Sequence, residues 1–288
     1  MQQERYPESE QLYTNALRLL DASETRDIRL ARTLYELAFV RKVLGRCGEA
    51  SGLALRALSV FKTLPNVPPE EQAQAWYTIA GSYTCQHLPS RAEHAFRKAI
   101  VLDQNTPPAF AALHRAGLGD ALMSEGKHAE ALKAYQDAEA IFRRGVSDQA
   151  AQACVLSSVG EAYRILGRFQ EADEKLVQGV ALLNGGAATP SERSILVRLL
   201  YNLALLHYHQ RRYEQAAVFY ARAAAVADRG TNMSPRGIGK MLLEFGDCLR
   251  KTGHKPEGAA LRAKAKALLR GPSPAEIVVD ASQLRRHK

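Results

Sequence analysis

The sequence of 288 residues has few of the features that mark a membrane protein, a secreted protein or a β-sheet protein. No stretch approaches the ~20 consecutive apolar residues of a membrane-spanning helix. The polar first segment, MQQERYPESEQ, lacks the apolar core of a signal peptide. Runs of β-branched residues, which a buried strand needs, are almost absent. These absences predict a soluble, all-α protein.

Closely spaced cysteines are absent as well. Cys47, Cys85, Cys154 and Cys248 are widely separated and form no Cys-x-x-Cys pair. This spacing argues against a zinc site and against a disulfide framework, so we expect a reducing compartment and a cytoplasmic protein. No histidine stands beside Cys154 in the sequence, so we expect this thiol to be a small packing residue and not a nucleophile.

Motifs for catalysis and for cofactor or metal binding are also missing. None of the eight histidines forms a His-x-x-x-His or His-Glu-x-x-His arrangement. His207 and His209 are two residues apart and would point to different sides of a helix. No nucleophile elbow, P-loop or dinucleotide fingerprint occurs. We therefore expect a protein that is not an enzyme and that binds no metal or cofactor.

The sequence contains instead a repeat of small, apolar and aromatic residues. Six segments share this order, which is typical of a helical hairpin. The second segment is the clearest, with Trp76, Ala80 and Tyr83 on a first helix and Ala92 and Phe96 on a second. Small residues let two helix axes approach closely, while large residues fill the space against the next hairpin.

One small residue marks the same place in every segment. Successive copies lie 39 to 44 residues apart, at Ala38, Ala80, Gly119, Gly160, Ala204 and Gly246. The pattern, over residues 25 to 270, resembles the tetratricopeptide repeat family, although that family's usual period is ~34 residues. The stretch 201–225 is most similar to the longer kinesin light chain repeats. HEAT repeats have a similar period but are disfavoured, because the order of small, aromatic and glycine residues recurs here.

The resemblance implies a right-handed superhelical solenoid of about six helical hairpins. Glycine is expected between the two helices of four units, where a left-handed residue ends the first helix: Gly45, Gly126, Gly167 and Gly253. Proline-rich loops are expected between repeats. The predicted segments are an N-terminal capping helix at 1–24, six units at about 25–64, 70–105, 108–145, 148–184, 191–229 and 235–270, and a tail at 271–288.

In the family, the first helix of each unit lines a concave groove that holds a peptide. By position, the resemblance assigns to this groove Arg32, Tyr35, Phe39, Lys42, Tyr77, Asp120, Glu161, Arg164, Arg198, Tyr201, Asn202, Tyr208, Lys240, Asp247 and Arg250. Asn202 matches an asparagine that reaches the peptide main chain in related repeats, since an amide both donates and accepts. The carboxylate clamp of chaperone-binding relatives needs several such asparagines and lysines, so a chaperone tail is not implied.

Positive charge is concentrated at the C-terminal end. Of the net charge of +9, a surplus of seven lies between Arg250 and Lys288. This end could attract nucleic acid. A solubilising role on a terminal helix is favoured, because cations suit a helix C-terminus and no aromatic residues interleave to stack bases. The apolar stretch 277–279 leaves two alternatives for the tail, disorder or docking on the repeats of its own chain.

The resemblance implies a non-catalytic scaffold or adaptor that binds a protein or peptide in the groove. The alternative is a regulatory or sensor module of a larger signalling or transcription system, with nucleic-acid contact through the basic C-terminus. We expect no membrane partner. The sequence does not identify the partner.

Overall fold

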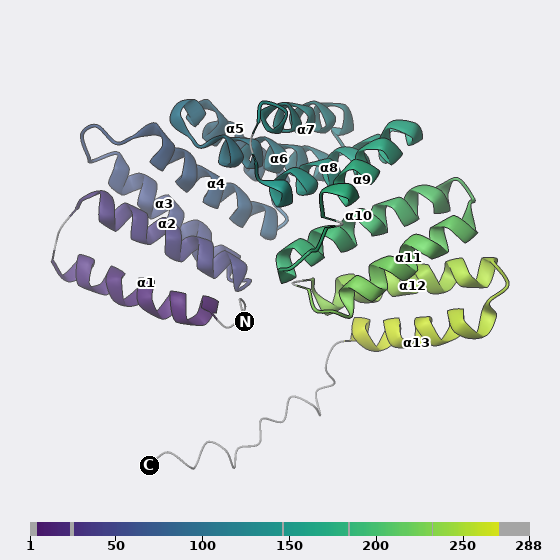
Figure 1. Ribbon diagram of the computed structural model, residues 1–288. Coiled ribbons are helices and arrows are strands. Elements are labelled where there is room, and N and C mark those ends of the chain that lie inside the picture. Colours follow the sequence, from purple (N-terminus) through teal and green to yellow (C-terminus); the bar gives the residue numbers. More distant parts are fainter. Residues whose placement is uncertain (1–4, 24–25, 146, 184, 232, 271–288) are drawn as a thin grey trace, which may run out of the picture. The chain divides into compact units, whose positions relative to one another are not determined.

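The computed structural model describes residues 5–23, 26–145, 147–183, 185–231 and 233–270 (Figure 1). Over these ranges all regular structure is helical, which confirms the predicted all-α class. None of the helices in the described ranges is long and apolar enough to cross a membrane. The stretch 277–279, on which the docking of the tail depends, lies outside the described residues, and that docking stays a prediction.

The chain divides into two compact units, residues 1–166 and 167–288, which are described separately. The first unit contains α1 (Arg5–Ala22), α2 (Ile28–Val43), α3 (Cys47–Phe61), α4 (Pro69–Cys85), α5 (Pro89–Val101), the 3-10 helix η1 (Asp103–Asn105), α6 (Pro108–Ser124), α7 (His128–Phe142) and α8 (Gln149–Ile165). The second contains α9 (Phe169–Leu183), α10 (Pro190–His209), α11 (Tyr213–Ala227), α12 (Pro235–Lys251) and α13 (Lys255–Arg270).

Neighbouring helices pack as hairpins within each unit (Figure 1). In the first unit α2 packs on α3, α4 on α5 and α6 on α7, while α1 lies against α2 at the N-terminal end. In the second unit α10 packs on α11 and α12 on α13. Five of the six predicted helical hairpins are therefore confirmed within the units, and the fourth, at about 148–184, stays a prediction. The exact boundaries of the capping helix, the six units and the tail stay predictions.

Prolines set where the first helices of four hairpins begin. Pro69, Pro108, Pro190 and Pro235 each start a helix, a position where the missing N–H has no intrahelical partner to lose. Before Pro190, the Thr189 side chain accepts from the backbone of the third helical residue and completes a capping box. These four helix starts lie between repeats, where proline was expected.

The turn inside each hairpin uses a residue in the left-handed region. The four predicted glycines have positive φ angles: Gly45 (81°), Gly126 (76°), Gly167 (73°) and Gly253 (90°). Two other turns use residues that carry a side chain, His87 (φ 56°) and Arg211 (φ 61°). A non-glycine residue costs about 1–2 kcal/mol in this conformation. The packing of the adjoining helices must compensate this cost.

The six small residues that define the repeat are all buried. At the crossing of α12 and α13 the two backbones touch: a Cβ added to Gly246 would lie 2.7 Å from the carbonyl oxygen of Gly258. At Gly119 an added Cβ would overlap the ring of Tyr135. The small residues are therefore required by close approach between the helices of a hairpin.

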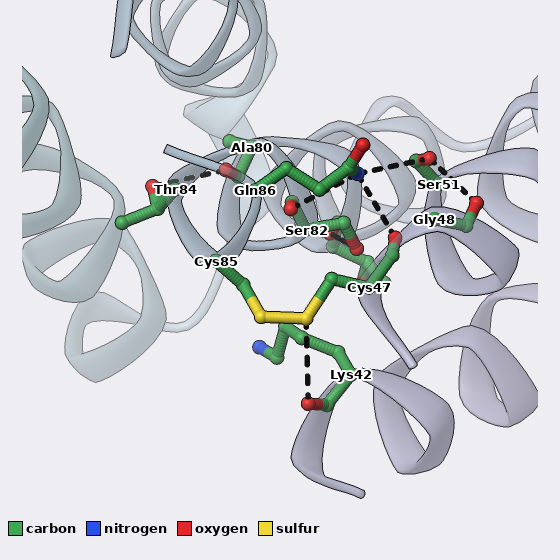
Figure 2. Close-up of a disulfide and its surroundings, with 10 residues drawn as sticks. Lys42, Cys47, Gly48, Ser51, Ala80, Ser82, Thr84, Cys85 and Gln86 are labelled. Atoms are coloured by element: carbon green, nitrogen blue, oxygen red, sulfur yellow. Dashed lines mark hydrogen bonds between the residues drawn. A yellow bond between two sulfur atoms is a disulfide. The ribbon is translucent and has the colours of Figure 1, made fainter. Parts of the chain in front are cut away.

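The expectation that the cysteines form no disulfide is wrong. Cys47, the first residue of α3, is bonded to Cys85, the last residue of α4, with the two Cα atoms 6.0 Å apart (Figure 2). The two residues are 38 positions apart, about one repeat, and the stacking of successive hairpins brings such positions together. Cys154 and Cys248 take no part in a disulfide.

Candidate protein-binding surfaces

The first helices of successive hairpins are neighbours in the first unit. Helix α2 contacts α4, α4 contacts α6, and α6 contacts α8. Seven of the predicted groove residues on these helices are exposed or half-buried, and we call them the first-helix face: Arg32, Phe39, Lys42, Tyr77, Asp120, Glu161 and Arg164. The eighth, Tyr35, is buried with 7% of its surface exposed.

A network of hydrogen bonds links α2 to α4 near the N-terminal ends of both helices, at one end of the first-helix face. The Arg32 guanidinium donates to Glu71 on α4, with Nε 2.8 Å from Oε1. The Tyr35 hydroxyl donates to the other carboxylate oxygen of Glu71 at 2.9 Å. Burial and this hydrogen bond raise the pKa of Tyr35, and burial together with Glu71 raises the pKa of Glu36. Arg32 and Tyr35 are thus engaged in holding α2 to α4. The repeat pattern in the sequence did not identify Glu71 as the partner of these two residues.

The centre of the first-helix face is aromatic. The Tyr77 ring lies 5.9 Å from the Phe96 ring and 4.9 Å from the His114 ring, measured between centroids. Burial raises the pKa of Tyr77 to about 12, and the nearby Cys154 and Asp120 add to the shift. Tyr77 of α4 and Asp120 of α6 are therefore near enough to interact electrostatically, whereas a shared role in peptide binding stays a prediction. Cys154 lies beside them, although its sequence context suggested only packing.

Lys42 lies at the other end of the first-helix face. Its ammonium nitrogen is 4.6 Å from the centroid of the Phe39 ring and 5.7 Å from that of Tyr77. Burial lowers the pKa of Lys42 to about 8, and no charged neighbour contributes to the shift. Its side chain crosses α4 at Gly81, where an added Cβ would lie 3.1 Å from Nζ. Sequence reasoning placed Lys42 on this surface but did not identify the role of Gly81.

Helix α8 contributes a carboxylate and a guanidinium to the face, Glu161 and Arg164, both half-buried. The Nε of Arg164 is buried and has no hydrogen-bond partner among the described residues. This edge of the first unit therefore presents both signs of charge.

The predicted residues of α10 in the second unit differ in accessibility. Arg198, Tyr201 and Tyr208 are half-buried, whereas Asn202 is only 2% exposed. The amide that was expected to read a peptide main chain therefore lies beneath the surface in this structure. Asn202 lies on the first helix of its repeat, as the resemblance required, but neighbouring side chains cover its amide. Peptide contact by Asn202 stays a prediction. The Tyr201 ring packs 6.1 Å from that of Tyr220.

A cation on α12 is held by two tyrosines. The Lys251 ammonium nitrogen is 4.4 Å from the centroid of the Tyr208 ring and 4.5 Å from that of Tyr213. The two rings are 5.4 Å apart and nearly perpendicular. Tyr208 is therefore occupied by a lysine of its own chain, which sequence reasoning did not foresee.

The three predicted residues of α12 are on its surface. Asp247 lies 3.6 Å from the Arg250 guanidinium and also pairs with Arg262 of α13. Lys240 is exposed. Asp247 and Arg250 are therefore engaged with each other, as Arg32 is with Glu71 in the first unit.

In the part of the chain that the structure describes, no group of three or more His, Cys, Asp or Glu side chains is placed to hold a metal ion.

Comparison with known proteins identifies the repeat. Residues 109–184 match the profile of the tetratricopeptide repeat family. A solved putative kinesin light chain of Podosopora anserina with nearly identical TPR-like repeats has a TM-score of 0.57 and 21% identity, covering 70% of this chain and 96% of that one. The likeness confirms the predicted similarity to the longer kinesin light chain repeats. No curated protein matches the sequence.

Two further solved structures cover most of the chain. A Rap protein complexed with competence and sporulation factor has a TM-score of 0.64 and 16% identity, over 93% of this chain and 71% of that one. Aspartyl phosphate phosphatase F from Bacillus subtilis has a TM-score of 0.62 and 13% identity, over 92% of this chain and 67% of that one. At these identities the likeness shows the fold alone.

Proposed function

We propose that this tetratricopeptide repeat protein is a non-catalytic scaffold that binds a protein or peptide partner. The observation that carries the proposal is the first-helix face, where four neighbouring helices present accessible aromatic and charged side chains. Aromatic rings supply contact area at low entropic cost, and charged groups fix orientation. The Rap protein complexed with competence and sporulation factor supports the proposal by likeness of fold.

Two alternative functions, catalysis and nucleic-acid binding, receive less support than the scaffold function. The strongly shifted pKa values on the first-helix face come mainly from burial of Tyr77 and Lys42, and not from an acid and base acting together. We therefore propose no catalytic role, although one structural relative is named as a phosphatase. Nucleic-acid contact through α13 is disfavoured, because Arg262 pairs with Asp247 and Lys264 lies 3.5 Å from Asp228.

The cellular location stays a prediction. The sequence pointed to the cytoplasm through its widely spaced cysteines. A disulfide between Cys47 and Cys85 is more typical of an oxidising compartment and argues against that location.

A selection of random peptides on the intact chain, followed by affinity measurements on variants, tests the scaffold proposal. Phe39→Ala removes an aromatic ring from the first-helix face. Leu55→Ala removes an exposed apolar side chain of α3 and is the matched control. We expect selected peptides to lose about tenfold or more in affinity with Phe39→Ala and to be unaffected by Leu55→Ala, since buried aromatic anchors dominate binding. Equal effects of the two variants, or no selected peptide, would refute the proposal.

A further inference from the structure

The two cysteines of the disulfide differ in their exposure to solvent. Cys85 ends α4 and is exposed, whereas Cys47 begins α3 and is only 6% exposed. A thiolate that exchanges with a disulfide attacks one of the two sulfurs, and access contributes to which one it attacks. A thiol from solution therefore reaches Cys85, and Cys47 is the leaving group.

The position of Cys47 favours its departure as a thiolate. Cys47 is the first residue of α3, and the preceding Arg46 provides no side-chain cap for this helix. The uncapped N–H groups of a first turn carry partial positive charge and stabilise a thiolate. The carboxylate of Glu49 in the same turn is paired with Arg41, whose Nη1 lies 2.9 Å from Oε2. A thiolate that is stabilised in this way leaves faster.

The surroundings of Cys47 do not depend on the bond to Cys85. Sγ of Cys47 lies 4.0 Å from the carbonyl oxygen of Lys42, to which a protonated thiol can donate (Figure 2). The side-chain nitrogen of Gln86 donates to the carbonyl oxygen of Cys47 at 3.0 Å and to Oγ of Ser51 at 3.2 Å. Buried apolar residues of α3 and α4 also belong to one hydrophobic core. The two helices therefore stay packed when the bond opens, and exchange can take place in the folded chain.

We propose that the Cys47–Cys85 disulfide is a thiol-exchange site at which a low-molecular-weight thiol modifies Cys85. The thiolate of the small molecule attacks Sγ of Cys85 and forms a new S–S bond with it. The bond between Cys85 and Cys47 breaks, and its electron pair leaves with Cys47, which then takes a proton from water. One disulfide is exchanged for another, so no oxidant is required. The site is independent of the scaffold function proposed above.

The modification removes a crosslink between the first two hairpins. Cys47 belongs to the hairpin of α2 and α3, and Cys85 belongs to the hairpin of α4 and α5. The bond spans 38 positions of the sequence and so restrains the separation of the two hairpins. Without the bond, α2 and α3 should open locally more often, which amide hydrogen exchange detects. Exchange at Cys85 thus makes the stability of the first hairpin depend on the surrounding thiol concentration.

Glutathione is the probe, and the full chain purified without reductant is the substrate. The chain is incubated with reduced glutathione, the reaction is stopped with acid, and free thiols are alkylated with N-ethylmaleimide in denaturant. Peptide mass spectrometry then locates both labels. We expect glutathione on Cys85 and the alkyl label on Cys47, with about tenfold or more glutathione on Cys85 than on Cys47, because access favours attack at Cys85.

Three variants test the assignment of the two sulfurs. Cys47→Ser leaves the exposed Cys85 alone, and this thiol should form a mixed disulfide with oxidised glutathione. Cys85→Ser leaves the buried Cys47, which should react about tenfold or more slowly with the same reagent. Cys154→Ser removes a half-buried thiol outside the disulfide and should leave the wild-type label pattern unchanged. A helical circular dichroism spectrum shows that each variant is folded.

The proposal is overturned if glutathione is found on Cys47 as often as on Cys85, or on neither. It is also overturned if both cysteines are alkylated in the untreated chain, or if the two single variants react at equal rates. In the modified chain, hydrogen exchange of α2 and α3 should rise several-fold while that of α12 and α13 stays the same. Unchanged exchange of α2 and α3 would show that the modification does not release the first hairpin.

Discussion

The crossing of α12 and α13 offers a quantitative test of the packing argument. Gly246 and Gly258 face each other, and a Cβ on Gly246 would lie 2.7 Å from the Gly258 carbonyl oxygen and 2.8 Å from Cγ of Arg262. The first obstacle is backbone, so a rotamer change cannot remove it. Overpacking of this kind costs about 1–3 kcal/mol, and alanine returns about 1 kcal/mol through its higher helix propensity.

Because the obstacle is backbone, we take the upper part of that range, about 2–3 kcal/mol, so Gly246→Ala should destabilise the second unit by a net of about 1–2 kcal/mol. For a chain of this size such a change lowers the melting temperature by roughly 2–8 °C. Gly52→Ala is the matched control, because Gly52 lies within α3 and an added Cβ would meet nothing within 4 Å. The same substitution should stabilise there by about 1 kcal/mol.

Thermal unfolding followed by circular dichroism measures both variants. Repeat arrays can unfold in parts, so hydrogen exchange of α12 and α13 should accompany the melting curves. The reasoning is refuted if Gly246→Ala melts at or above the wild-type temperature, because the two backbones would then have room to separate at no cost. A destabilised Gly52→Ala would show that the helix propensity part of the argument is wrong.

Three further changes have expected outcomes. Cys85→Ser should lower the unfolding midpoint and abolish its response to reductant; the bond closes a loop of 38 residues, which corresponds to at most about 4 kcal/mol. Arg211→Gly should raise stability by about 1 kcal/mol in denaturant titrations, since it relieves a left-handed turn with φ 61°. A chain ending at Arg270 should bind selected peptides more tightly than the intact chain if the tail docks on the repeats, and equally if it does not.

Much of the fold could be predicted from the sequence because local chemistry and packing agree. Ala38, Gly119 and Gly246 occupy crossings where only a small side chain fits, so their spacing reports the hairpin directly. Glycine was also a reliable sign of a hairpin turn. The turns at His87 and Arg211 could not be predicted in this way, because neither residue is a glycine. The packing of the adjoining helices there holds a residue in a backbone conformation that its side chain disfavours.

Less of the candidate site than of the fold could be predicted from the sequence. Repeat position placed Phe39, Lys42 and Tyr77 on one surface, but it could not show that Lys42 has no acid beside it. It also could not show that Asn202 is covered by its neighbours. Burial and pairing depend on side chains from other helices, and these are not contained in the pattern of one repeat.

The links between successive hairpins nevertheless follow a rule that the sequence contains. Arg32 and Glu71 are 39 residues apart, the disulfide joins residues 38 apart, and Lys251 reaches Tyr213 across 38. Arg32 and Glu71 lie on two successive first helices, whereas the other two links join the start of a second helix to the end of the next first helix. In both arrangements, residues about one period apart face each other. The same spacing relates Lys42 to Gly81, and a glycine has no side chain with which the lysine could pair. In this chain, an arginine that faces a carboxylate one period later is therefore a link between helices, whereas a lysine that faces a glycine packs on the backbone of the next first helix.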